Sequence, residues 1–122
     1  MWTQIMRHSD PFLRLKRSRF RRNVYLDSRE RNIFYIYGEE IMREHARRII
    51  REKLAKPASE LDDGHQTPMR GHPVFKAMHA TATCCRKCLF RWHRIPRYRH
   101  LEQHEIEFIV NMLMMWIRAK AA

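Results

Sequence analysis

The sequence contains little glycine and proline, with 3 and 5 residues of these types among 122. This scarcity argues against a sheet protein with many turns and favours helices. No apolar run reaches the roughly 20 residues needed to cross a bilayer, so we expect no contact with membrane through a spanning helix. The first twelve residues, "MWTQIMRHSDPF", also lack the uninterrupted apolar segment of a signal peptide.

Cysteine is scarce too, and the three cysteines all lie between positions 84 and 88. An odd number of cysteines so close together does not form a disulfide framework, and we therefore expect a cytoplasmic protein. Acidic residues are few, with 13 Asp and Glu against 25 Lys and Arg, which gives a formal net charge of +12 at pH 7. Such a charge attracts nucleic acid, although charge alone specifies no sequence and a well-solvated surface would also account for it.

The abundant residue types indicate a mainly α-helical protein. The helix formers Arg, Glu, Met, Leu, Ile and Ala dominate, and a hydrophobic content of 44% argues against global disorder. We expect residues 1–122 to form a single helical domain of about five helices, stabilised by zinc. We also expect residues 1–9 to be disordered and residues 57–72, "PASELDDGHQTPMRGH", to form a long central loop.

Start and stop signals for helices recur in the first half of the chain. Asp10 and Pro11 suit the start of a helix over "DPFLRLKRSRFRRNVYL". The sequence "DSRE" at 27–30 matches a capping box, and the short helix after it should end at Gly38. The clearest helix, "EEIMREHARRIIREKLAKP", should stop before Pro57.

The second half of the chain predicts two short helices and one long one. A short helix should begin at Pro73, and "CCRKCLFRWH" can form another turn or two. The last helix should run from about Glu102 to Ile117. Its apolar residues fall on one face, which we expect to be buried: Ile106, Ile109, Val110, Leu113, Trp116 and Ile117.

The stretch "HATATCCRKCLFRWH" places three cysteines and two histidines within residues 79–93. Zinc prefers four thiolate or imidazole ligands in a tetrahedral shell. Cys85 and Cys88 have a spacing that lets two thiolates converge on one ion. Cys84 can replace Cys85, because residues 84 and 88 also share a helix face. The resulting hypothesis is one zinc ion held by Cys88 together with Cys85, or with Cys84 in its place.

Histidines complete the expected zinc site. His79 lies six residues before Cys85 and His93 five residues after Cys88, so both can supply imidazole nitrogen. His65 and His72, in the loop just upstream, offer substitutes. The predicted ligands are therefore drawn from His79, Cys84, Cys85, Cys88 and His93.

Two other interpretations of the cysteines stay open. Free cysteines are often buried as small hydrophobic residues. Alternatively, the flanking cations Arg86 and Lys87 would lower the pKa of a thiol and favour a reactive thiolate. A catalytic zinc of the deaminase type is not indicated, because Thr81 stands where the catalytic Glu would follow His79. No residue can be assigned as catalytic.

Basic and aromatic residues alternate after the cysteines. Cations contact phosphates and flat rings stack on bases, so this mixture is typical of single-strand recognition. The alternative is that the rings face the core while the cations are solvated. The aromatic residues are Phe90, Trp92 and Tyr98, and the candidate nucleic-acid contacts are Arg86, Lys87, Arg91, Arg94, Arg97 and Arg99.

Four parts of the sequence carry a resemblance to a known family: "DGHQTPMRGHPVFKAMHATATCCRKCLFRWHRIP", a later helix ending "MWI", and the upstream "REHARRIIREKL" and "RSRFRR". In these parts the sequence resembles a small bacterial family known as domain of unknown function 4186. The resemblance covers most of the chain. The sequence departs from the family pattern at Met78, Lys87 and Tyr98, where Gln, Gly and Gly are expected, and none of these changes removes a candidate ligand. The family label implies no activity.

These observations favour a zinc-stabilised nucleic-acid-binding or accessory module. The alternative is a small metalloenzyme with an open metal position near the 64–72 loop, where three protein ligands plus water would bind the ion. A third class, a partner-binding helical protein with ordinary cysteines, would bind no metal.

Overall fold

The computed structural model describes residues 11–122, and this part of the chain is helical with no strand. This confirms the predicted fold class. The expected disorder of residues 1–9 lies outside the described residues. None of the described helices is long and apolar enough to cross a membrane. The elements are α2 (Pro11–Leu15), α3 (Arg19–Arg22), α4 (Ser28–Leu54), the 3-10 helix η1 (Ala58–Glu60), α5 (Pro73–Ala80), α6 (Arg86–His93) and α7 (Gln103–Ala121).

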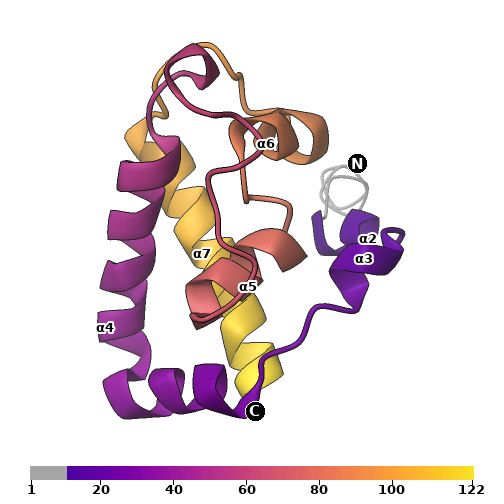
Figure 1. The fold of residues 1–122 in the computed structure, drawn as a ribbon, viewed down its shortest axis with the longest axis vertical. Helices are drawn as coiled ribbons and strands as arrows, with labels where there is room; N and C mark the ends of the chain where they lie inside the picture. The colour runs from indigo at the N-terminus through magenta and orange to yellow at the C-terminus, as the bar shows by residue number, and fades with distance from the viewer. Residues whose placement is uncertain (1–10) are drawn as a thin grey trace, which may run out of the picture.

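Helix α4 consists of two arms that meet at a sharp bend (Figure 1). Gly38 lies at the bend with φ 81° and ψ 172°, a left-handed conformation that glycine adopts easily. The prediction that the first helix ends at Gly38 is therefore confirmed. The predicted capping box is also present, since Asp27 accepts from the Glu30 N–H at 2.8 Å and Glu30 accepts from the Asp27 N–H at 2.9 Å.

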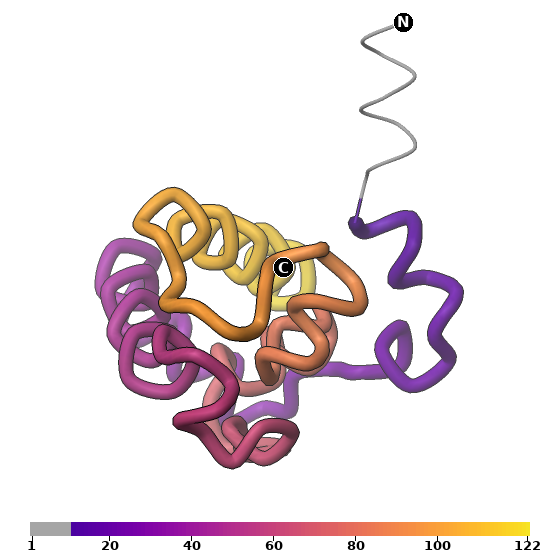
Figure 2. Tube along the Cα trace, turned by 90° about the horizontal axis from the view of Figure 1, so that it is seen from above, coloured from indigo at the N-terminus to yellow at the C-terminus, as the bar shows by residue number. Residues whose placement is uncertain are grey.

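The core forms where the second arm of α4, α5 and α7 pack side by side (Figures 1 and 2). The arm contributes a buried residue at every fourth position, which places all of them on one helix face. The apolar face predicted for the last helix is buried as expected. Together these faces supply Met42, Ala46, Ile50, Leu54, Ile106, Ile109, Val110, Leu113, Trp116 and Ile117.

The N-terminal segment differs from its prediction as one helix. The structure divides it into α2 and α3, because the chain turns at Lys16–Ser18 and Ser18 caps α3 by accepting from the Arg21 N–H at 3.3 Å. The segment lies beside α5 and α6, on the opposite side of the molecule from the second arm of α4 (Figures 1 and 2). Arg14 joins it to α6 by donating to the Trp92 carbonyl at 2.7 Å.

The connection between α4 and α5 is tied to its surroundings. Thr67 Oγ1 donates to the Cys84 carbonyl at 2.7 Å, and the Gly71 N–H donates to the buried Glu30 carboxylate at 2.8 Å. Asp63 accepts from the Lys87 N–H at 3.1 Å. These bonds hold the predicted central loop against the cysteine segment and the start of α4.

His72 caps α5 and must be neutral to do so. Its Nδ1 accepts from the Val74 N–H at 3.0 Å, which a protonated nitrogen could not do. Burial, with a further contribution from nearby His45, lowers the pKa of His72 to about 4, although Glu30 acts in the opposite direction. The unfolded chain therefore binds a proton at a higher pH than the folded one, and stability falls as the pH drops from about 6.5 towards 4.

His72→Asn tests this linkage, because asparagine can cap the helix but does not titrate. We expect the wild type to lose about 2 kcal/mol more stability than His72→Asn between pH 7 and pH 5, measured by urea unfolding. Burial also lowers the pKa of His79 and His93. Their contribution to the pH dependence of stability is the same in the wild type and in His72→Asn, so it cancels in the comparison. An identical pH dependence in the two proteins would contradict the assignment to His72.

Candidate metal centre

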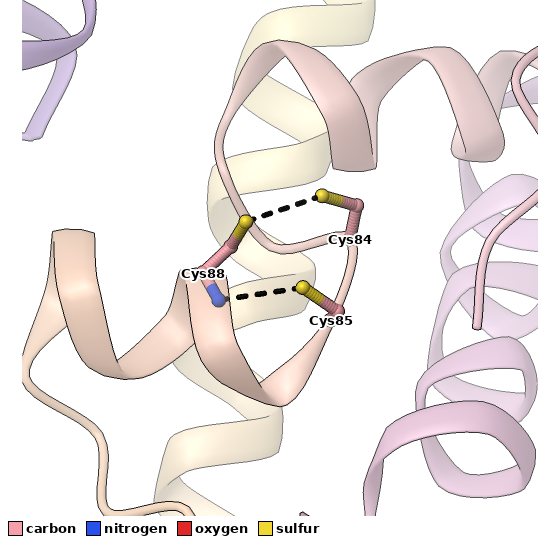
Figure 3. A group of neighbouring side chains, drawn as sticks. All are labelled: Cys84, Cys85 and Cys88. Atoms are coloured by element: carbon pink, nitrogen blue, oxygen red, sulfur yellow. Dashed lines mark hydrogen bonds between the residues drawn. The ribbon is translucent and has the colours of Figure 1, made fainter. Parts of the chain in front are cut away.

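A tight turn between α5 and α6 positions the cysteines. Ala82 has φ 59°, and the Thr83 N–H donates to the Met78 carbonyl at 2.8 Å, which closes the end of α5. Thr81 is fully buried, and its hydroxyl donates to the Ala77 carbonyl at 2.7 Å. The chain thereby reverses and brings Cys84 next to the first turn of α6 (Figure 3).

The three cysteine sulfurs form one cluster (Figure 3). All Sγ atoms lie within 4.8 Å of one another, and the Cys84 and Cys88 Sγ atoms are 3.6 Å apart. Cys85 is the N-cap of α6, and its Sγ accepts from the Cys88 N–H at 3.4 Å. Cys84 and Cys85 are buried and Cys88 is half-buried. Both Cys84 and Cys85 therefore lie in the cluster, and either could be a ligand.

The cluster has the chemistry and spacing of a metal site. Two sulfurs bound about 2.3 Å from a tetrahedral zinc ion lie about 3.8 Å apart, close to the 3.6 Å between Cys84 and Cys88. Soft thiolates select zinc, Cu(I) or iron–sulfur clusters over hard cations. Three cysteines that converge in this way could hold a metal ion.

The thiols do not have the properties of a reactive nucleophile. The pKa of Cys84 is raised, chiefly by its hydrogen bond with Cys85. The pKa of Cys88 is raised, chiefly by its hydrogen bond with Cys84, and burial adds to both effects. A thiol with a raised pKa is protonated at neutral pH, which argues against the reactive-thiolate interpretation.

Arg21 of α3 supplies a positive charge next to the sulfurs. Its guanidinium donates to Cys88 Sγ at 3.3 Å and to the His79 carbonyl at 2.6 Å, and lies 5.3 Å from the Trp92 ring centroid. Three thiolates around a divalent ion carry a net charge of −1, which one arginine balances. Arg21 is 67 residues from Cys88, and nothing in its basic stretch distinguished it beforehand.

The candidate histidines lie outside the sulfur cluster. His79 Nε2 donates to the carbonyls of Thr67 and Pro68, at 3.2 and 3.0 Å. His93 Nε2 donates to the Thr81 carbonyl at 2.7 Å, and its Nδ1 is buried and has no hydrogen-bond partner among residues 11–122. The structure therefore brings together three of the five predicted ligands, Cys84, Cys85 and Cys88.

The two substitute histidines are also accounted for. His65 has an exposed side chain near Asp62, with 77% of its surface accessible. His72 caps α5. Neither belongs to the sulfur cluster.

The predicted nucleic-acid contacts divide into three groups. Arg86 is fully buried, so it cannot contact a nucleic acid, contrary to expectation. Arg97 pairs with Asp63 at 2.5 Å and Arg99 pairs with Glu105 at 2.8 Å, so their charges are largely neutralised. Three cations are left exposed: Lys87, Arg91 and Arg94.

Arg86 holds the loop before α7 against the end of α4. Its guanidinium donates to the carbonyls of Leu54 at 3.0 Å, Lys56 at 2.6 Å and Arg99 at 2.9 Å, and also to that of Pro96. Leu54 is the last residue of α4, so this contact satisfies a carbonyl at its end.

A comparison with protein families finds a match over nearly the whole described chain. The model described as a domain of unknown function, DUF4186, matches residues 9–118. No solved structure matches.

Proposed function

The chain belongs to the DUF4186 family, whose description assigns no activity, and we propose from its own side chains that it is a zinc-stabilised accessory module. The thiolates of Cys84, Cys85 and Cys88 would hold one zinc ion. The observation that carries this proposal is the convergence of three sulfurs within 4.8 Å.

The bound ion would add to the stability of the fold. Cys84 and Cys85 come from the turn after α5, while Cys88 lies in the first turn of α6. An ion shared by all three would fasten the turn to the helix, and the ligands gather only in the folded chain. Metal ligation requires reduced thiols, which is why we also propose a cytoplasmic location.

His93 lies outside the sulfur cluster, and we propose that it supplies the fourth ligand when the ion binds. A metal-bound histidine usually donates its other ring N–H to a carbonyl or carboxylate, as His93 Nε2 does to the Thr81 carbonyl at 2.7 Å. This leaves Nδ1, a buried nitrogen with no hydrogen-bond partner in the described part of the chain, available to bind metal. Four protein ligands are the mark of a closed structural site.

Titration with Co²⁺ tests the site, because Co²⁺ can occupy zinc sites and its thiolate complexes absorb light, whereas zinc has no visible spectrum. We expect one equivalent to produce thiolate-to-cobalt charge-transfer absorption, reduced when any one of Cys84, Cys85 and Cys88 is replaced by serine. His93→Gln should weaken metal affinity at least about tenfold. Absence of the charge-transfer band in the reduced protein would contradict metal binding by the cluster.

A small metalloenzyme is the second candidate, and the count of three clustered ligands favours it. An open fourth position would accept water, and the 64–72 loop adjoins the cluster through the Thr67–Cys84 bond. In that case His93→Gln would leave affinity unchanged, and added small anions would alter the cobalt spectrum. A closed site predicts the opposite result for both measurements.

We propose that the exposed basic residues at the start and end of α6 bind nucleic acid. The support is the formal net charge of +12 together with the exposure of Lys87, Arg91 and Arg94. Binding through phosphates should weaken steeply as salt is raised, since each contact releases counterions.

A further inference from the structure

A cleft of about 410 Å³ lies between the N-terminal segment and α6. Arg14 of α2 and Arg17 of the following turn line one side. Arg91 and Trp92 of α6 and Arg94, which ends α6, line the other. Residues nearly 80 positions apart in the chain therefore form one concave surface.

The cleft concentrates positive charge, and no acidic residue is among the described residues that line it. None of its four arginines belongs to an ion pair with the carboxylates of residues 11–122. Arg17, Arg91 and Arg94 are exposed, while Arg14 donates to the Trp92 carbonyl. The four guanidinium groups that line one cleft repel one another, and an anion in the cleft would relieve that repulsion.

The chemistry of the lining selects among anions. Guanidinium groups bind phosphate oxygens through pairs of parallel hydrogen bonds, and an indole offers a flat surface for an unpaired base. A duplex turns its bases inward and could not reach Trp92 in this way. We propose that the cleft binds a single-stranded nucleic acid, with the arginines contacting its phosphates and Trp92 contacting a base.

This inference rests on the proposed nucleic-acid role and gives that role a location. If the strand binds in the cleft, its affinity should depend on Arg17 and Arg91 in particular. If net charge alone attracts the strand, loss of any two exposed cations should weaken binding equally. The two explanations can be separated with variants of equal charge.

The test compares Arg17→Gln/Arg91→Gln with Arg48→Gln/Arg51→Gln. Each variant loses two positive charges, and all four side chains are exposed with no ion pair among the described residues. The control arginines lie on the second arm of α4, across the molecule from α2 (Figure 2). Binding of a labelled single-stranded oligonucleotide is followed by anisotropy at several salt concentrations, on proteins shown to have equal melting temperatures and metal content.

We expect the cleft variant to bind at least about tenfold more weakly than wild type, with a salt slope smaller by about 1.4, while the control changes by less than about threefold. Equal losses in the two variants would overturn the cleft and leave general charge attraction. Failure of the wild type to bind any strand at about 50 mM salt would overturn the nucleic-acid role itself. Binding of pyrophosphate but no strand, lost only in the cleft variant, would keep a phosphate site but overturn the strand as its occupant.

Discussion

Replacing Cys88 by serine is expected to abolish stoichiometric zinc binding and to lower the melting temperature by about 10 °C or more. Cys88 provides one of only three clustered sulfurs and lies 3.6 Å from the Cys84 sulfur. Loss of a structural metal removes folding free energy directly, and a loss of about 3 kcal/mol corresponds to about 10 °C for a domain of this size. Zinc content and thermal unfolding measure the two effects.

A chelator supplies the matched control for Cys88→Ser. Because a ligand stabilises only a protein that binds it, chelation should lower the melting temperature of the wild type towards that of the variant. The variant itself should be unaffected. If chelation lowered both melting temperatures equally, or neither, the stabilising ion would not be bound through Cys88.

Replacing Arg86 by methionine is expected to cost about 3–5 kcal/mol of unfolding free energy. Methionine keeps much of the apolar stem but leaves four carbonyl oxygens without their donor, two of them near the end of α4. The positive charge near that helix end is lost as well. Urea unfolding at saturating zinc measures the loss without changing metal occupancy.

Two further variants separate geometry from charge at this position. Arg86→Lys keeps the charge, but a single ammonium cannot span carbonyls of both the α4 end and the 96–99 loop, so we expect an intermediate loss. Lys87→Met changes the adjacent exposed side chain and should cost less than about 0.5 kcal/mol. A loss below about 1 kcal/mol for Arg86→Met would show that water replaces the guanidinium.

Local sequence signals predicted the helices well. The bend at Gly38 and the capping box of Asp27 and Glu30 depend on residues within a few positions of one another. The buried face of α7 depends only on the helical repeat. The N-terminal segment was harder to predict, because Ser18 can either continue a helix or cap a new one, and here it caps α3.

The sulfur cluster was also predictable, because Cys84, Cys85 and Cys88 are local. The rest of the site depends on contacts between distant segments. Arg21 reaches Cys88 from 67 residues away. The sequence predicted Arg86 to be a surface cation. Its side chain is buried because the end of α4 and the 96–99 loop pack together and supply carbonyl acceptors for it.

Zinc content measured on the untagged, reduced protein tests the central claim most directly. Elemental analysis should be combined with a count of reactive thiols, and the protein should carry no histidine tag, which would itself bind metal. The account predicts about one zinc ion per chain and cysteines that react only after chelation. A protein without metal and with three freely reactive thiols would contradict it.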